Sequence, residues 1–313
     1  MSVNNREDSS IPERNVANVP RVAALLSDNE LKTLNDLELA LYLADCADAI
    51  SSARFLAIDL HVETKPDLTP VSDADKDIEE MVRKVLSIAR PNDGIVGEEF
   101  GSTVQSGVDG EKFNSKRYWV IDPIDGTKNF VRGVPVWATL LALMKNDDVL
   151  VGVVSAPALF RRWFASKGQG AFLAVNGSNA NSSTRKLRVS AVNKLEDASL
   201  SISTFASPTT GNRNDGWGAL HPGLLKLAEQ VWRTRAYGDF WSHMLVAEGA
   251  VDCALEPKLA LWDMAPLAII VTEAGGRFSD FQGVDGPNGA NGVSTNGALH
   301  EAILSYFSKI YLS

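Results

Sequence analysis

The sequence predicts a mixed α and β fold, α+β in its first half and α/β in its second half. Three observations support this prediction. Apolar residues recur at helical spacing early in the chain, and several short apolar runs typical of strands follow them. Later, strand-like runs alternate with helix-like segments, which favours a parallel or mixed sheet. The length of 313 residues is long for one hydrophobic core and suits two subdomains packed together.

The N-terminal region is expected to begin with a flexible tail. Residues 1–34 are polar and show little periodicity. An amphipathic helix is predicted over residues 37–57, and a second runs from about residue 75 to residue 89. Between them, residues 65–70 have the composition of a polar turn.

Strands are expected after these two helices. Short apolar runs predict strands at residues 94–97 and 118–121, separated by a loop at 101–116 that is rich in Gly, Ser and charge. Two further strands, at 136–144 and 149–155, are joined by a polar turn typical of a hairpin.

A subdomain boundary is predicted near residue 190. Residues 176–185 form a polar loop shortly before it. The boundary separates an α+β subdomain at 35–190 from an α/β subdomain at 191–313. In the second subdomain, strands are expected at residues 198–203 and 251–255, and helices at residues 223–231, 241–249, 262–274 and 298–310.

Composition and charge exclude several classes of protein. The formal net charge of −9 and the pI near 5.0 make nucleic acid an unfavourable partner. The two cysteines and four histidines show no spacing typical of a zinc site, so oxygen ligands for a hard cation fit better. No apolar run reaches the roughly 18 residues of a membrane span, and the polar N-terminus resembles no signal peptide, so we expect a cytoplasmic protein without a membrane partner.

The most specific motif follows the predicted strand at 118–121 and reads Asp122-Pro123-Ile124-Asp125-Gly126-Thr127. Two aspartates on either side of a proline turn can point toward one locus. Gly126 allows close approach of a ligand, and the amides that follow can open a helix whose N-terminus favours phosphate. Asp-Pro and Asp-Gly pairs also occur in plain turns, so the motif needs further acids around it to count as a site.

Four more acidic residues supply this context. Glu98 and Glu99 follow a predicted strand, Asp263 begins a predicted helix, and Asp75 lies in a helix first turn. Each has an ordinary alternative taken alone: a solvated loop for the glutamates, an N-cap for Asp263, and a favourable helix-dipole position for Asp75. Their joint occurrence favours a carboxylate cluster.

These motifs, in this order and at this spacing, resemble those of the inositol monophosphatase family. They comprise Gly97-Glu98-Glu99, the central Asp122–Thr127 motif, and Trp262-Asp263 with the later Glu273-Ala274-Gly275-Gly276. The resemblance extends from about residue 37 to the C-terminus. It implies a layered αβαβα sandwich, a Mg²⁺-dependent phosphomonoester hydrolase, and a homodimer.

The resemblance also implies roles for individual residues. Thr127 would orient or activate the attacking water, with Glu99 as a second catalytic residue, and the amides of Gly126 and Thr127 would hold phosphate oxygens. The implied ligands of two or three Mg²⁺ ions are Glu98, Asp122, the carbonyl of Ile124, Asp125, Asp263 and, for a weaker site, Asp75.

Electrostatics agree with such a metal site. Carboxylates within about 5 Å of one another repel by several kcal/mol per pair at an effective dielectric near 20. Without metal, some of them would bind protons. Mg²⁺ relieves the repulsion, and no Cys or His nucleophile is needed, so no phosphoenzyme is expected.

The substrate is predicted from a closer likeness to the histidinol-phosphate phosphatase branch. The run 128–139, the segment 238–242 and Glu256-Pro257 carry this likeness. Asp239 and Glu256 suit the ammonium group of histidinol phosphate, and Trp241 offers a flat face for its imidazole. Lys128 is a further candidate for substrate binding, with a surface cation as the alternative.

Several alternatives remain open. Trp241 could belong to the core, Asp239 could cap a helix, and Arg161 and Arg162 could form a basic patch for an anionic substrate or, more simply, a solvated pair. Other enzymatic functions are an inositol-1-phosphatase or a broad sugar- or nucleotide-phosphatase. A further alternative is a catalytically silent binding protein on the same fold. Such a protein would lack Thr127 or at least one of the metal ligands, and this sequence has all of them.

Overall fold

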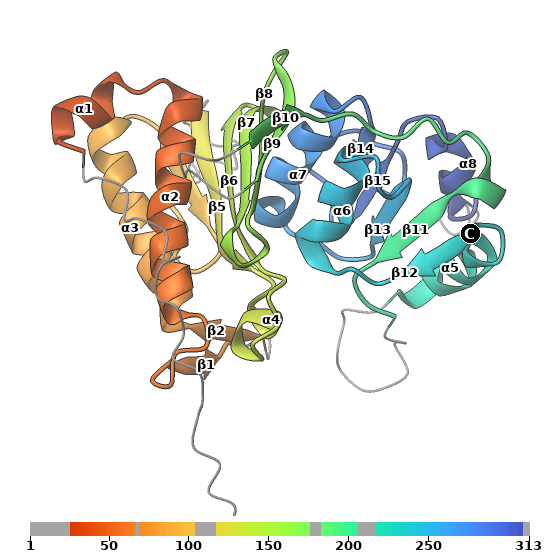
Figure 1. Ribbon diagram of the computed structural model, residues 1–313, viewed down its shortest axis with the longest axis horizontal. Coiled ribbons are helices and arrows are strands. Elements are labelled where there is room, and N and C mark those ends of the chain that lie inside the picture. The colour runs from red at the N-terminus through yellow and green to blue at the C-terminus, as the bar shows by residue number, and fades with distance from the viewer. Residues whose placement is uncertain (1–25, 67–68, 104–116, 176–182, 206–216, 309–313) are drawn as a thin grey trace, which may run out of the picture.

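The computed structural model describes residues 26–66, 69–103, 117–175, 183–205 and 217–308, and these form five stacked layers. From left to right, Figure 1 shows a helical layer, an eight-stranded sheet, two central helices, a five-stranded sheet and an outer helical layer. The αβαβα sandwich expected from the resemblance is therefore confirmed. The part of the chain that the structure describes contains no helix long and apolar enough to cross a membrane.

The first helical layer consists of α1 (Asp28–Thr33), α2 (Asp36–Arg54) and α3 (Asp73–Ala89). The predicted helices at 37–57 and 75–89 correspond to α2 and α3. The prediction of a flexible tail over residues 1–34 is wrong for α1, because Ser27 and Glu30 form a capping box that starts a helix there. The rest of that prediction, residues 1–25, lies outside the described residues.

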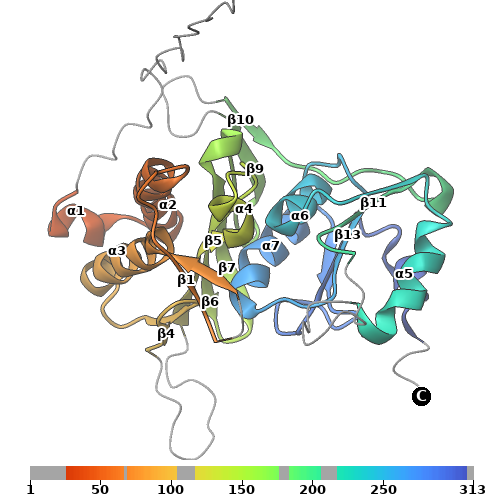
Figure 2. The same cartoon turned by 90° about the horizontal axis from the view of Figure 1, so that it is seen from below.

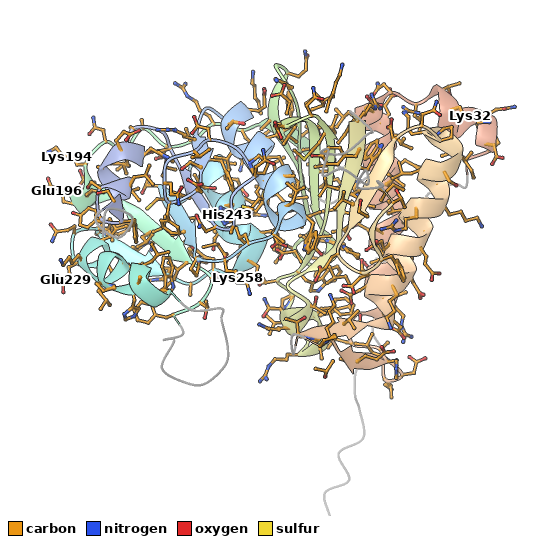
Figure 3. All side chains as sticks on the ribbon, turned by 180° about the vertical axis from the view of Figure 1, so that it is seen from behind. Lys32, Lys194, Glu196, Glu229, His243 and Lys258 are labelled. Atoms are coloured by element: carbon orange, nitrogen blue, oxygen red, sulfur yellow. The ribbon has the colours of Figure 1, made fainter. Side chains whose placement is uncertain are left out.

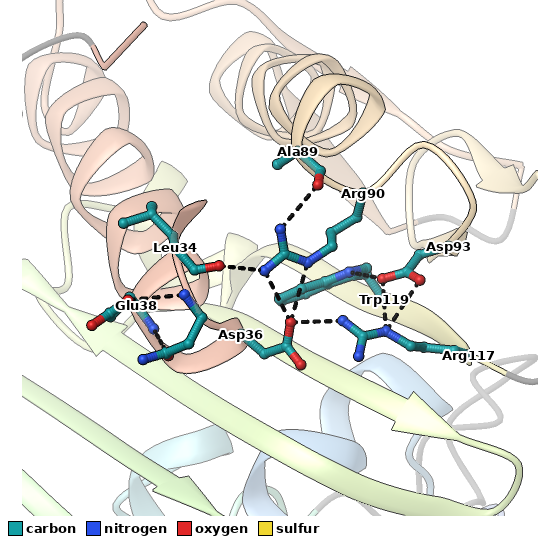
Figure 4. Close-up of polar contacts among 9 residues, drawn as sticks. Leu34, Asp36, Glu38, Ala89, Arg90, Asp93, Arg117 and Trp119 are labelled. Carbon is teal, nitrogen blue, oxygen red and sulfur yellow. Dashed lines mark hydrogen bonds and ion pairs between the residues drawn. The ribbon is translucent and has the colours of Figure 1, made fainter. Parts of the chain in front are cut away.

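A polar cluster fixes the first layer to the sheet (Figure 4). Asp36 at the start of α2 accepts hydrogen bonds from Arg90 (3.1 Å) after α3 and from Arg117 (2.6 Å). Arg117 also pairs with Asp93, which accepts a further bond from the indole N–H of Trp119. Burial opposes ionisation of Asp36, but the two guanidinium groups prevail and lower its pKa.

The eight-stranded sheet has the order β10-β9-β8-β7-β6-β5-β3-β4. The expected strands appear as β3 (Gly94–Gly97), β5 (Arg117–Asp125), β6 (Ala138–Lys145) and β7 (Asp148–Ala156). The sequence did not predict four of its strands, which are β4 (Gly101–Ser102), β8 (Arg161–Ser166), β9 (Gly170–Val175) and β10 (Ser183–Lys186). Parts of the two predicted loops thus pair as β4 and β10, while residues 104–116 and 176–182 lie outside the described residues.

The C-terminal layers follow once the chain leaves β10. The five-stranded sheet has the order β12-β11-β13-β15-β14, with strands β11 (Ser199–Ile202), β12 (Arg233–Arg235), β13 (Cys253–Glu256), β14 (Arg277–Ser279) and β15 (Gly292–Thr295). The central helices are α6 (Asp239–Ala247) and α7 (Leu261–Glu273), and the outer ones are α5 (His221–Ala228) and α8 (His300–Leu304). The predicted helix at 298–310 is thus shorter, with residues 309 and 310 outside the described part.

The motif region lies at one end of the eight-stranded sheet, where β5 ends. The short hairpin of β1 (Val62–Thr64) and β2 (Pro70–Ser72) and the short helix α4 (Thr127–Val131) lie together at one end of the sheet (Figures 1 and 2). The central helix α7 packs against β5, β6 and β7, so its N-terminus can meet the end of β5. This packing brings Asp263 of α7 close to Asp122 and Asp125 of β5.

Candidate metal and substrate site

The central motif lies where β5 ends and α4 begins. Pro123 has no N–H to give to the sheet, and pairing with β6 is irregular between Asp122 and Asp125. Gly126 adopts a φ of 84°, and a Cβ there would lie 2.9 Å from the Val136 carbonyl oxygen, so only glycine fits without strain.

Aromatic packing holds this turn in place. Phe130 of α4 is 1% exposed, and its ring centroid lies 5.0 Å from that of Trp137 and 5.5 Å from that of Phe55. Such ring pairs add about 0.5–1.5 kcal/mol beyond the area they bury. The motif is therefore anchored to the core through Phe130, the fourth residue of α4.

Three carboxylates converge at this point from β5 and α7. Ligand oxygens of Asp122, Asp125 and Asp263 lie within 4.8 Å of one another. Burial raises the pKa of Asp122 and of Asp125 well above the ordinary value, and neighbouring negative charges raise both further. Burial likewise raises the pKa of Asp263 to about 6. The chain thus concentrates negative charge here without neutralising it.

Backbone groups orient two of these acids. The Phe240 N–H donates to Asp125 Oδ2 (2.8 Å), and the Ala260 N–H donates to Asp263 Oδ2 (2.7 Å). The N-cap alternative for Asp263 is wrong, because Ala260 is the N-cap of α7 and Asp263 is the third residue of the helix, where it also faces the cluster. Asp122 Oδ1 is buried and has no hydrogen-bond partner among the described residues. An unpartnered buried oxygen facing other carboxylates fits a bound cation.

Asp75 and Thr127 adjoin the cluster. The Thr127 hydroxyl oxygen lies 3.0 Å from the carbonyl oxygen of Ile124 and 3.4 Å from Asp75 Oδ1. The hydroxyl and the backbone N–H of Ser72 both donate to Asp75 Oδ2. Burial raises the pKa of Asp75 to about 6, in spite of these bonds. The structure thus brings both predicted residues and the Ile124 carbonyl to one place.

Glu98 and Glu99 follow β3 and face a lysine that the sequence did not single out as functional. Lys65 Nζ lies 2.8 Å from Glu98 Oε1 and 2.6 Å from Glu99 Oε1. Burial disfavours the ammonium, but the bonds to the two glutamates prevail and raise the pKa of Lys65. Burial also raises the pKa of Glu99 to about 7. The ammonium group of Lys65 thus lies beside Glu98 and Glu99.

Asp239 approaches from α6, the central helix on the other side. It is the first residue of that helix, with a positive φ of 42°, which is rare outside glycine. Its Oδ2 accepts a hydrogen bond from the Asn129 side chain (3.1 Å). Such strained residues cluster at functional sites, where surrounding contacts hold them.

A cavity of about 160 Å³ opens between these groups and β13. It is lined by Asp125, Asp239, Phe240, His243, Glu256, Lys258, Leu259, Asp263 and Leu267. Figure 3 shows His243 within the C-terminal half and Lys258 below it. Glu256 is 5% exposed, and its Oε2 accepts a hydrogen bond from the Ser203 hydroxyl (2.6 Å). Burial raises the pKa of Glu256 well above its usual value, and the charge of Asp239 adds to the effect.

Two predicted substrate residues lie apart from this cavity. Trp241 is partly buried, packs against the core and meets Tyr237 at 5.7 Å between ring centroids, and it is not among the lining residues. Lys128 is exposed on α4. Asp239 and Glu256, by contrast, both line the cavity, so the structure brings two of the four side chains together there.

Both interpretations of Arg161 and Arg162 are wrong. Arg162 is 5% exposed and bonds to Asp45 (2.6 Å) and Asp48 (2.7 Å) of α2, while Arg161 pairs with Glu248. Neither arginine lines the cavity, and both form ion pairs with acidic residues of the chain. Strand β8 directs Arg162 into the interface with α2.

The sequence also did not identify His243 as a site residue. A signal was available, since His243 lies four residues after Asp239 and therefore on the same face of one helix. Lys65 had no such signal, because the hairpin that carries it meets Glu98 only in the folded chain.

Comparisons with known proteins agree with this site. The model of the inositol monophosphatase family matches residues 36–312. Two relatives named histidinol-phosphatase are each 52% identical to the chain: one from Mycobacterium tuberculosis over 87% of this chain and 97% of that protein, and one from Streptomyces coelicolor over 89% and 98%. Among solved structures, an IMPase from Thermotoga maritima has a TM-score of 0.72 and 27% identity, covering 89% of this chain and 98% of that one. The chain therefore belongs to the inositol monophosphatase family and is a phosphoric monoester hydrolase.

Proposed function

We propose that this enzyme hydrolyses L-histidinol phosphate to L-histidinol and inorganic phosphate in a Mg²⁺-dependent reaction. The observation that carries the proposal is the identity of 52% with two histidinol-phosphatases over nearly their whole length. A cavity rich in carboxylates beside the Asp122–Asp125–Asp263 cluster supports it, because the substrate carries an ammonium group beside its phosphate.

The donor set fits Mg²⁺, which prefers hard oxygen ligands. We assign Glu98, Asp122, the Ile124 carbonyl, Asp125 and Asp263 as ligands, with Asp75 for a further ion, two or three ions in all. Bound there, Mg²⁺ would offset the carboxylate repulsion and supply Lewis-acid stabilisation of phosphoryl charge. The unpartnered Asp122 Oδ1 supports this assignment independently of the family.

The chain's own groups are assigned as follows. Thr127 orients the attacking water, and the Glu99 carboxylate accepts its proton as the water oxygen bonds to phosphorus. The amides of Gly126 and Thr127 hold phosphate oxygens. The bond from phosphorus to the alcohol oxygen then breaks, and that oxygen takes up a proton to leave as histidinol.

The alcohol side of the substrate is assigned to Asp239 and Glu256. Both carboxylates line the cavity, and each can accept hydrogen bonds from an ammonium. Lys128 is kept as a phosphate-side cation. Trp241 packs against the core, so no stacking role is assigned to it.

The test is phosphate release with Mg²⁺, comparing kcat/KM for L-histidinol phosphate and inositol-1-phosphate. We expect a preference of about a hundredfold or more for L-histidinol phosphate, equivalent to roughly 2.7 kcal/mol of differential transition-state binding. Chelation by EDTA should abolish turnover of both. A comparable or reversed preference would leave a phosphatase of another substrate, such as inositol-1-phosphate, and would remove the roles of Asp239 and Glu256.

The homodimer implied by the family resemblance stays a prediction. Light scattering of the purified enzyme at several concentrations would check it, and a mass near 33.8 kDa throughout would contradict it.

A further inference from the structure

His243 and Glu256 line the cavity, and each is hydrogen-bonded to a serine. His243 is fully buried, and its Nδ1 lies 2.6 Å from the Ser294 hydroxyl. Glu256 is held at Oε2 by the Ser203 hydroxyl. Each side chain thus has one polar atom bonded to a serine. The remaining polar atoms, His243 Nε2 and Glu256 Oε1, face each other at 3.9 Å.

Neither of these facing atoms has a hydrogen-bond partner among the described residues, although both are buried. Unpartnered buried polar atoms are uncommon in native proteins, and those that occur call for an explanation such as an unseen ligand. Both side chains line the cavity next to the carboxylate cluster. The pair therefore belongs to the wall of the cavity in which the proposed function places the alcohol part of the substrate.

The ring of His243 has little freedom to turn away. The ring of Phe278 lies 5.8 Å from it between centroids. A Cβ on Gly292 of β15 would lie 3.7 Å from His243 Cε1, 2.8 Å from Leu259 and 3.1 Å from Phe278, so the glycine makes room for this packed group. The Nε2 position is thus set by packing as well as by Ser294.

The contact between His243 Nδ1 and Ser294 Oγ allows the tautomer in which Nδ1–H donates to the hydroxyl. In that tautomer Nε2 carries no proton and accepts a hydrogen bond. Burial keeps the imidazole neutral by lowering the pKa of His243 to about 3.

We infer that His243 Nε2 and Glu256 Oε1 together accept hydrogen bonds from a primary ammonium group on the alcohol part of the substrate, with His243 as a specificity-determining residue. Two acceptors 3.9 Å apart can share one nitrogen that lies about 2.8 Å from each of them. One carboxylate and one neutral acceptor suit an ammonium, which has three donors, better than a hydroxyl, which has one. The inference rests on the proposed hydrolysis of a phosphate monoester at the adjacent cluster and adds His243 to its selectivity.

The test compares two substrates in one variant. L-histidinol phosphate and its des-amino analogue differ only in the ammonium group. In the wild type we expect a kcat/KM ratio of at least about a hundred, because a site built to bind a donor rejects an analogue that lacks it. In His243→Phe the ratio should fall about tenfold or more, because kcat/KM for L-histidinol phosphate falls further, through KM, than kcat/KM for the analogue.

His300→Phe is the matched control. His300 is also buried, but both of its ring nitrogens have partners, Ser279 and Thr295, and it does not line the cavity. This variant should lose thermal stability without changing the substrate ratio. If His243→Phe does not fold, His243→Leu with the same two substrates replaces it, and the same fall is expected.

Binding of L-histidinol, measured by calorimetry with Mg²⁺ and inorganic phosphate present, gives a readout that does not depend on turnover. We expect the Kd to rise about tenfold in His243→Phe. Equal falls in kcat/KM for both substrates would show that His243 has a purely structural role. An unchanged kcat/KM ratio together with an unchanged Kd for L-histidinol would mean that only water bridges His243 and Glu256. Either result overturns the inference.

Failure of the proposed function has a different signature. If the wild type ignores L-histidinol phosphate, the comparison is repeated with 2-aminoethyl phosphate and ethyl phosphate. A wild-type preference for the amine that His243→Phe removes would support the ammonium subsite without histidinol, and no preference would overturn it.

Discussion

Two groups of acidic side chains lie against the eight-stranded sheet, and among the described residues only one of them is paired with a basic residue. Asp45 and Asp48 of α2 meet Arg162 of β8, which also donates to the Ser155 hydroxyl. Asp122 and Asp125 of β5 meet Asp263 of α7, and none of these three forms an ion pair with a basic residue in the described part of the chain.

The difference separates structure from function. A buried acid that the chain pairs with its own arginine serves packing, because the pair compensates its own charge. A group of acids that the chain leaves uncompensated keeps a cost in folding that a bound cation removes. The Lys65 pairs with Glu98 and Glu99 are intermediate, since that lysine lies on a short hairpin at the edge of the site.

The largest effect is expected from Asp122→Asn. Loss of a central ligand should lower kcat by at least about a thousandfold. In the absence of metal, the free energy of unfolding should stay the same or rise by up to about 2 kcal/mol, because one repelling carboxylate is removed. Steady-state phosphate release and urea unfolding in EDTA measure the two quantities. Near-normal turnover would defeat the assignment of Asp122 as a ligand.

Arg162→Met should have the reverse effect. It leaves Asp48 buried without its cation, which costs about 3–5 kcal/mol of unfolding free energy. At a temperature where the variant is folded, kcat/KM should stay within about threefold of the wild type.

Arg161→Met is the control for this variant. It should cost less than about 1 kcal/mol, because Glu248 keeps its bonds to Arg185 and the Trp163 indole. Equal stability losses in the two arginine variants would remove the contrast between the two acidic groups.

Gly126→Ala tests whether backbone geometry holds the uncompensated group. The added Cβ meets the Val136 carbonyl at a positive φ, so we expect a loss of about 1–3 kcal/mol and a fall in kcat. Gly168→Ala shares the positive φ but has nothing within 4 Å of the new Cβ, and should lose stability without losing kcat per folded molecule. If Gly126→Ala retained full kcat, the turn would not be a positioning element.

The smallest expected effect is a pH dependence of metal stabilisation. Asp75 and Asp263 have folded pKa values of about 6, above the ordinary value of 3.8, so the metal-free folded state binds protons more tightly than the unfolded chain. Their contribution to stability therefore falls as pH rises from about 4 to 6. His243 and His300 act oppositely, since their pKa values are lowered to about 3 and about 4.

The measurement is the difference in Tm between samples with Mg²⁺ and with EDTA at the same pH. The effect of the two histidines on stability is the same in both samples and cancels. Protons compete with Mg²⁺ for these carboxylates, so the rise in Tm caused by Mg²⁺ should be larger at pH 7.5 than at pH 5.5, by about 1 kcal/mol in equivalent free energy. A stabilisation independent of pH would mean that Mg²⁺ binds away from these acids.

Local sequence determined much of the fold and the centre of the site. Periodicity predicted α2, α3 and α7 to within three residues at each end, and β3 was predicted to the residue. The convergence of Asp122 and Asp125 was predictable because a strand end, a proline and a glycine constrain neighbours in the chain, whereas Thr127 was singled out only by the family resemblance. The polar strands β10 and β12 were not, because strand formation in such residues depends on the neighbouring strand that pairs with them.

Only the tertiary structure decided which distant polar groups meet. Arg162 and Asp48 are 114 residues apart in sequence, and Ser203 and Glu256 are 53 apart, so no local pattern links them. The same holds for Trp241, which packs against the core although its neighbour Asp239 faces the cavity, and for His243, whose free Nε2 gains meaning only opposite Glu256. Sequence fixes which side chains share a helix face, whereas the packing of α6 against β13 and β15 decides what that face meets.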